Sequence, residues 1–326
     1  MTAHDGLAEF LELPVRDFPA LGDEPGEPDD TASLPSASAV AWRLWLNDDI
    51  GESDETYEEY VARFLGRVDA TEIRELVISS WGAVYDDSSE LPVRLLCEAA
   101  DRLPNLRAIA LGDIPSDEAE ISWIEQSDLT PLLEAFPRLE ILEVRGGTGL
   151  SLRPFRHERL RVLRFETGGL PGEVIRAIGR SELPRLEHLE LWLGVPNYGG
   201  EWLPADFDGV RSGEGLPALR HLGLQNSEAQ DEVAALVAAA PVVARLESLA
   251  LSMGVLTDEG AEALLSGQPL THLKRLDLHH HYLTDPMIDR LRTALPGVDL
   301  NVGEQEVPRR YSWSGDEDHY YVVVSE

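Results

Sequence analysis

Apolar and polar residues alternate in a short phrase that recurs along most of this chain. In the clearest copy, Leu276 and Leu278 are apolar, and Arg275 and Asp277 beside them are polar. A period of two is typical of a strand with one buried face. The pattern therefore predicts one short strand per copy, and the first apolar residues of these copies are Ala41, Ile73, Leu106, Leu139, Leu160, Leu186, Leu219, Leu246, Leu273 and Val298.

After each predicted strand the apolar spacing changes from two to three or four. In the copy that begins at Leu273, Thr284 or Asp285 can cap a helix and Pro286 suits its first turn. The apolar residues of Met287–Leu295 then follow helical spacing. A single strand–loop–helix unit cannot bury its apolar face alone, and the copies lie 21 to 33 residues apart. The repeat therefore predicts a solenoid.

The repeat resembles the leucine-rich-repeat family, in particular its ribonuclease-inhibitor-like class. The phrases at Leu246–Leu251 and Leu273–Leu278 and the run LTDEGAEAL at Leu256–Leu264 carry the resemblance, which covers residues 40–302. One departure is the ninth position of the phrase, where the family usually has Asn or Cys and this chain often has glycine. The resemblance implies an α/β fold, a leucine-rich-repeat solenoid with a curved parallel β-sheet on the concave side and helices on the convex side. The chain is also similar to an uncharacterised group of actinobacterial leucine-rich-repeat proteins.

The two ends of the chain depart from the repeat. We expect residues 1–38 to form an N-terminal cap, with a strand at Leu13–Phe18, followed by an acidic loop, because the end strand of a solenoid must be covered. Residues 39–302 form the predicted solenoid. Residues 303–326 form a predicted C-terminal cap with a terminal strand over Tyr320–Val324, where the sequence is YYVVV.

The charge balance narrows the range of partners. The 326 residues include 60 acidic and 27 basic ones, which gives a net charge of −33. Nucleic acids and anionic membranes are bound through basic surfaces, so the sequence predicts neither as a partner. The acid excess either keeps an elongated protein soluble or attracts a basic protein. Because the chain has one cysteine and neither a signal-peptide pattern nor an apolar run of about 18 residues, we expect a cytoplasmic protein.

The outward positions of the predicted sheet offer a binding surface. Equivalent residues in a parallel stack form columns about 4.8 Å apart. The middle columns bring an aromatic residue close to hydrogen-bonding groups, a combination typical of hot spots. We therefore predict a site for a protein or peptide on the concave face, and the alternative is an ordinary solvated sheet face. The predicted residues are His188, Glu190, Trp192, His221 and Gln225.

The segment Gly194–Gly215 is a second candidate for a binding element. It holds Tyr198, Trp202 and Phe207 among several glycines. A loop of this kind beside a concave face is either a binding loop or a flap packed on the coil, and the sequence leaves both interpretations open.

Histidine offers a different chemistry in the run His279-His280-His281. Two imidazoles and a carboxylate suit zinc or nickel, so Asp277, His279 and His281 form a candidate weak metal site, and the alternative is a polar loop. No established catalytic signature or cofactor motif is present. Our leading hypothesis is a non-catalytic scaffold without a cofactor that binds a protein or peptide. The alternatives are an accessory subunit or a metal-dependent enzyme that uses His188, Glu190 and His221, and a structural component of a larger assembly.

Overall fold

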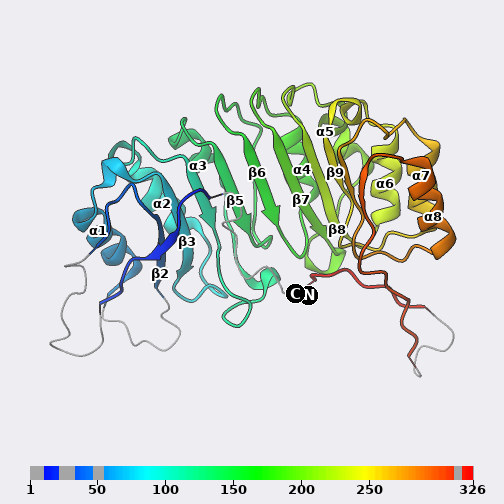
Figure 1. Cartoon of the computed structure of the whole chain (residues 1–326). Helices are drawn as coiled ribbons and strands as arrows, with labels where there is room; N and C mark the ends of the chain where they lie inside the picture. Colours follow the sequence, from blue (N-terminus) through cyan, green and yellow to red (C-terminus); the bar gives the residue numbers. More distant parts are fainter. Residues whose placement is uncertain (1–10, 22–33, 47–54, 312–317, 326) are drawn as a thin grey trace. The chain divides into compact units, whose positions relative to one another are not determined.

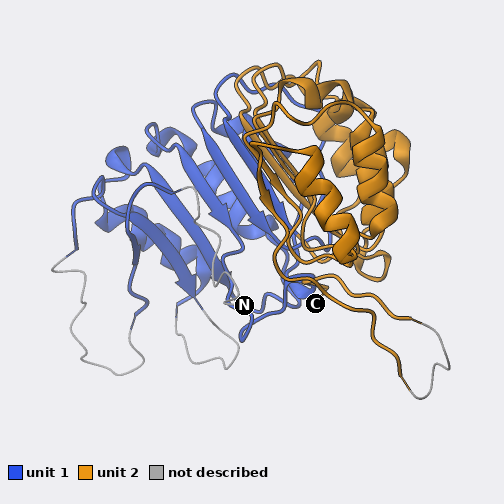
Figure 2. Ribbon diagram, turned by 45° about the vertical axis from the view of Figure 1, so that its right-hand side comes forward, with its two compact units in different colours: residues 1–166 blue, residues 167–326 orange. Residues whose placement is uncertain are grey.

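The computed structural model describes residues 11–21, 34–46, 55–311 and 318–325 (Figure 1). Most of the expected acidic loop, residues 22–33, lies outside these ranges. The chain divides into two compact units, Met1–Glu166 and Thr167–Glu326 (Figure 2). Strand, loop and helix repeat in chain order within each unit, as the phrase predicts.

Unit 1 has six strands within its described residues, and each pairs in parallel with the next along the chain. Equivalent positions of the phrase face each other, so that Glu75 pairs with Ala108 and Ala108 pairs with Ile141. The strands are β1 (Val15–Asp17), β2 (Ala41–Leu46), β3 (Glu75–Trp81), β4 (Ala108–Leu111), β5 (Ile141–Arg145) and β6 (Val162–Glu166). The helices are α1 (Tyr57–Arg67), α2 (Glu90–Glu98) and α3 (Thr130–Ala135), with 3₁₀ turns at Ala70–Glu72, Ala100–Arg102 and Ile121–Trp123.

Unit 2 has five strands within its described residues, and they pair in parallel in the same consecutive order. None of the helices in the described part of the chain has the length and apolar character needed to cross a membrane. The strands are β7 (His188–Gly194), β8 (His221–Ser227), β9 (Ser248–Ala250), β10 (Arg275–Asp277) and β11 (Asp299–Asn301). The helices are α4 (Gly172–Gly179), α5 (Asp208–Ser212), α6 (Gln230–Ala238), α7 (Asp258–Ser266) and α8 (Asp285–Ala294), with 3₁₀ turns at Pro196–Tyr198, Pro204–Phe207 and Pro241–Arg245.

The two faces of the sheet differ within each unit. The helices of each unit lie along one face of its strands (Figure 1), and the inward residues of the phrase, such as Leu189 and Leu191 on β7, are 0% exposed. The outward residues of the phrase lie on the other side, which we term the open face. Apolar burial on one side of each strand explains why the repeat specifies this arrangement. The predicted α/β repeat of parallel strands and helices is confirmed within each unit.

The N-terminal segment extends the sheet and also covers part of the open face of unit 1. β1 lies within the strand expected there and pairs with β2. Just before β1, Leu11 packs on Val77 and Ala110, two outward residues of β3 and β4. The carboxylate of Glu75 accepts hydrogen bonds from the main-chain N–H groups of the two residues that follow Leu11, at 3.2 and 3.1 Å. The open face of unit 1 therefore holds an extended piece of this chain.

The strand predicted over Tyr320–Val324 does not form. Val323 donates its main-chain N–H to the carbonyl of Met253 at 2.9 Å. The Asn226 side chain is hydrogen-bonded to the main-chain N–H and carbonyl of Val324. The Tyr282 hydroxyl is hydrogen-bonded to the main-chain N–H and carbonyl of Tyr321. These partners lie near the end of β8 and after the ends of β9 and β10 in turn. The tail therefore crosses the repeats instead of pairing along one strand, and the prediction of a terminal strand is wrong.

Candidate functional site

The five residues predicted as a binding surface do come together, on the open face of β7 and β8. His188, Glu190 and Trp192 alternate along β7, so their side chains share one face. In the register of the two strands, His221 lies opposite His188, and Gln225 lies opposite Trp192. We term these five residues the β7/β8 patch.

The exposure of the patch differs from that expected of a surface anchor. Trp192 is only 7% exposed, and Glu190 and Gln225 are also buried. The indole N–H of Trp192 donates to Oε1 of Glu190 at 3.0 Å, so the aromatic side chain supports the carboxylate. His188 and His221 are half-buried. Trp192 therefore offers little surface to a partner, and the half-buried imidazoles are the groups of the patch that a partner can reach. The use of these five residues for binding stays a prediction.

The two imidazoles and Glu190 form a compact cluster. The rings of His188 and His221 are stacked, with centroids 3.9 Å apart and an angle of 12° between their planes. Oε2 of Glu190 lies 3.3 Å from Nε2 of His188 and 4.0 Å from Nε2 of His221. Nδ1 of His221 is hydrogen-bonded to Oγ of Ser248 at 2.7 Å. Among the described residues, these three are the only group of His, Cys, Asp or Glu whose ligand atoms all lie within 4.8 Å of one another.

Burial controls the charge of His221. It lowers the pKa of this imidazole to about 4, because the charged ring loses hydration inside the fold. His188 and Arg275 lower the pKa further, and the carboxylate of Glu190 opposes them. His221 is therefore neutral at pH 7 and keeps a lone pair on one ring nitrogen.

The second predicted site, made of Asp277, His279 and His281, does not form. Nδ1 of His279 lies 2.7 Å from Oδ1 of Asp277, and this hydrogen bond raises the pKa of His279. His281 is 0% exposed, and both of its ring nitrogens are engaged with the main chain. Nδ1 accepts from the N–H of Leu283 at 3.1 Å, and Nε2 donates to the carbonyl of Val302 at 3.3 Å. His281 therefore has no lone pair for an ion, and the metal prediction for these residues is wrong.

His281 should make stability depend on pH. Burial lowers its pKa from the usual value of 6.5, and Nδ1 must stay unprotonated to accept its hydrogen bond. The contribution to stability is therefore complete above pH 6.5 and is lost as pH falls toward the folded-state pKa, since the unfolded chain then binds the extra proton. We expect the free energy of unfolding to fall between pH 7 and pH 5, and His281→Asn to reduce this fall in urea titrations. His272→Asn, at an exposed histidine, is the control, and an unchanged pH dependence in His281→Asn would contradict the assignment.

A network of buried charges on the open face of unit 1 was not predicted as a unit. β5 and β6 place Glu143 opposite Arg164, and Arg145 opposite Glu166. Nη2 of Arg145 lies 2.8 Å from Oε2 of Glu166, and Nη2 of Arg164 lies 2.7 Å from the other oxygen. Arg164 also lies 3.3 Å from Glu143, and all four residues are buried. The opposite charges at equivalent positions of adjacent phrases were the signal in the sequence.

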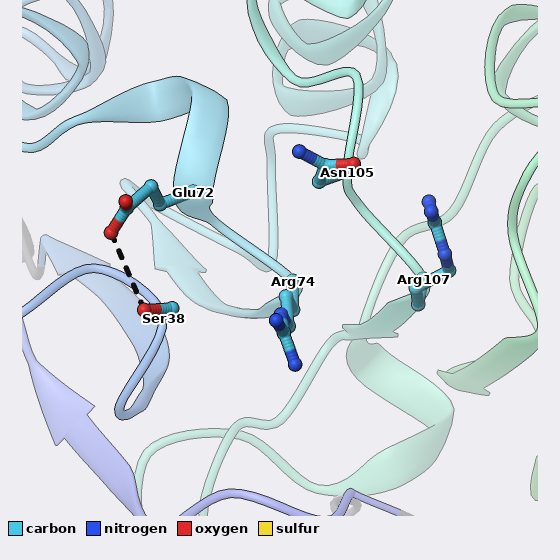
Figure 3. Close-up of a pocket in the computed structure, with 5 residues that line it drawn as sticks. All are labelled: Ser38, Glu72, Arg74, Asn105 and Arg107. Atoms are coloured by element: carbon cyan, nitrogen blue, oxygen red, sulfur yellow. Dashed lines mark hydrogen bonds between the residues drawn. The ribbon is translucent and has the colours of Figure 1, made fainter.

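A polar pocket of about 360 Å³ lies at the entry to β3 and β4 in unit 1 (Figure 3). Burial lowers the pKa of Arg107, and neighbouring arginines add to the effect. Two guanidinium groups and an amide suit a carboxylate or phosphate group, whereas Glu72, which accepts from Ser38 at 3.3 Å, repels one. Arginine at the second position of successive phrases was the signal that could have found it. The lining residues are Ser38, Glu72, Arg74, Asn105 and Arg107.

The segment Gly194–Gly215 is folded against its own unit. It forms two 3₁₀ turns and α5, and Phe207 is 0% exposed, with its ring packed edge-on against that of Trp202 at 5.1 Å. Gly209 lies so close to α4 that a Cβ there would meet the carbonyl oxygen of Gly179 at 2.2 Å. This packing favours the interpretation as a flap over that as a binding loop.

Comparison with known proteins supports the fold and gives no activity. No protein-family model matches the sequence, and no curated protein does. The chain is similar to a Bacteroides fragilis protein solved as a structural-genomics target, with 29% identity and a TM-score of 0.75 over 87% of this chain and 76% of that one. A weaker similarity joins it to an internalin of Listeria monocytogenes, with 16% identity and a TM-score of 0.42 over 82% of this chain and 62% of that one. A similarity at that TM-score supports no conclusion.

Proposed function

We propose that this chain is a non-catalytic scaffold that binds an extended segment of a partner protein on the open face of its sheet. One observation carries the proposal. In unit 1 that face already holds Leu11, which packs on Val77 and Ala110. The carboxylate of Glu75 accepts hydrogen bonds from the main-chain N–H groups of the two residues that follow Leu11. A carboxylate that accepts hydrogen bonds from main-chain N–H groups, beside a small apolar patch, can hold an extended peptide. Such contacts place few requirements on the sequence of that peptide.

The β7/β8 patch is the proposed contact site in unit 2. It combines two half-buried imidazoles with a carboxylate and an amide held in place by the strands. Groups held on regular strands lose little conformational entropy on binding, which favours affinity. The net charge of −33 favours a basic partner, and it should act mainly on the rate of association.

A displayed library of random short peptides tests this function. We expect selected peptides to be rich in Lys and Arg, and His188→Ala to weaken their binding about tenfold or more, since truncation at a contact that matters costs over about 1.4 kcal/mol. Rising salt should slow association more than it speeds dissociation. The control is Arg290→Ala on α8, whose guanidinium is exposed and pairs with Glu262. Equal weakening by both variants, or selected peptides that are acidic, would contradict the proposal.

A metal-dependent enzyme, or an accessory subunit of one, is the second candidate function. The convergence of His188, Glu190 and His221 favours it. We also propose membership of the ribonuclease-inhibitor-like class, as the resemblance implies. Terminal caps at residues 1–38 and 303–326 and a cytoplasmic location, expected from the sequence itself, are proposed as well. The likeness to an actinobacterial group and the expected lack of nucleic-acid and membrane partners stay predictions.

A further inference from the structure

Three potential ligand atoms converge on the open face of unit 2. Oε2 of Glu190 lies between the two imidazoles, 3.3 Å from Nε2 of His188 and 4.0 Å from Nε2 of His221. An ion held at the usual 2.0–2.2 Å by three tetrahedral ligands places those ligand atoms about 3.3 Å apart. The cluster therefore has nearly the size of a three-ligand metal site before any ion enters.

The strands fix this arrangement, and no loop contributes to it. His188 and Glu190 are two residues apart on β7, so their side chains leave the same face. His221 is the direct partner of His188 in the register of β7 and β8. Ligands on paired strands are held more closely than ligands on loops, which reduces the cost of ordering them.

Outer hydrogen bonds set the ligand groups in the form that a metal requires. Nδ1 of His221 is hydrogen-bonded to Oγ of Ser248 at 2.7 Å, and the buried Nε2 has no hydrogen-bond partner. In the tautomer in which Nδ1 donates to the hydroxyl, the lone pair of the ring lies on Nε2. The indole N–H of Trp192 holds Oε1 of Glu190 at 3.0 Å and so orients Oε2 toward the imidazoles. Partners of this kind fix the tautomer and direction of metal ligands.

We propose that His188, Glu190 and His221 bind one divalent transition-metal ion, with zinc as the best match. Two imidazoles and one carboxylate suit zinc and its neighbours better than Mg²⁺ or Ca²⁺, which prefer all-oxygen sites. Three protein ligands leave a fourth position for water or for a group from a partner. The stacked rings must turn so that their lone pairs meet at the ion, and both rings are half-buried.

Metal titration of the untagged full chain, first treated with a chelator, tests the site. We expect one zinc ion per chain by calorimetry, and Co²⁺ in its place should show the visible absorption of a tetrahedral ion. His221→Gln and Glu190→Gln should each weaken zinc binding by more than about 100-fold, because loss of a ligand exceeds the 10–100-fold effect of an outer partner. Ser248→Ala should weaken it by about 10–100-fold.

His279→Ala is the matched control, since His279 also pairs with a carboxylate but belongs to no three-ligand group among the described residues. The His279→Ala variant should bind zinc as the wild type does in the calorimetric titration. Much less than one zinc per chain, or equal binding by His221→Gln and the wild type, would overturn the proposal. If a variant fails to fold, the ring-nitrogen NMR signals of His188 and His221 in the wild type decide, since both must shift with zinc. The assay uses the purified chain alone, so a negative result here leaves the peptide-binding function standing.

Discussion

Replacing Glu166 by alanine should lower the free energy of unfolding by about 3–5 kcal/mol, the usual cost of breaking a buried ion pair. Glu166 is 0% exposed and its two carboxylate oxygens lie 2.8 Å from Arg145 and 2.7 Å from Arg164. Alanine removes the carboxylate that both guanidinium groups share, and two buried positive charges then lie close together. Urea unfolding followed by circular dichroism measures the change.

The ion pair of Glu158 with Arg156 is the control for this prediction. Its atoms also lie close, at 2.7 Å, but its side chains are 59% and 69% exposed. Solvent screens an exposed pair, so Glu158→Ala should cost no more than about 1 kcal/mol. Similar costs at Glu158 and Glu166 would mean that the network of unit 1 is open to water.

Replacing Leu276 by alanine should lower the free energy of unfolding by about 2–5 kcal/mol. Leu276 is 0% exposed on β10, at an inward position of the clearest phrase in the chain. The loss combines the transfer of the missing atoms to water with the cavity that remains in a packed core. The same urea titration measures it.

Lys274→Ala, two residues earlier, is the matched control. The side chain of Lys274 is 74% exposed and pairs with Glu247 on the surface, so we expect a cost within about 1 kcal/mol. Asp277, the outward neighbour of Leu276, is a poorer control, because its carboxylate accepts hydrogen bonds from His279, Arg275 and Asn301. Equal losses in Leu276→Ala and Lys274→Ala would show that the inward assignment is wrong.

Most of the fold could be predicted because the repeat states the same local pattern many times. Ala41, Ile73 and Leu186 were placed at or just before strands, and β2, β3 and β7 begin at Ala41, Glu75 and His188. The tail was the exception. Its YYVVV sequence has strong strand propensity, but strand formation requires a partner with a free edge, and Asn226 and Tyr282 bind the tail through side chains instead.

The membership of the β7/β8 patch was also predictable, since a parallel register aligns equivalent positions of successive phrases. The sequence could not give the burial of Trp192, because exposure depends on all the neighbours of a side chain and not on the direction in which it leaves its strand. For the same reason the sequence could not show that His281 is unable to bind a metal ion. Both of its ring nitrogens are hydrogen-bonded to main-chain groups, 2 and 21 residues away.

The sequence by itself determined which residues of each repeat point inward, which point outward, and which repeats are neighbours. These properties are periodic, and any short stretch of chain expresses them through apolar burial. Only the tertiary structure decided how closely the outward groups approach one another and how far each is buried. The 4.0 Å between Glu190 and His221, the paired charges of Arg145 and Glu166, and the cover that Leu11 gives to β3 and β4 join residues that are 21 or more apart in the chain. Such contacts depend on side-chain conformations and on how the ends of the chain return to the sheet, and neither is periodic.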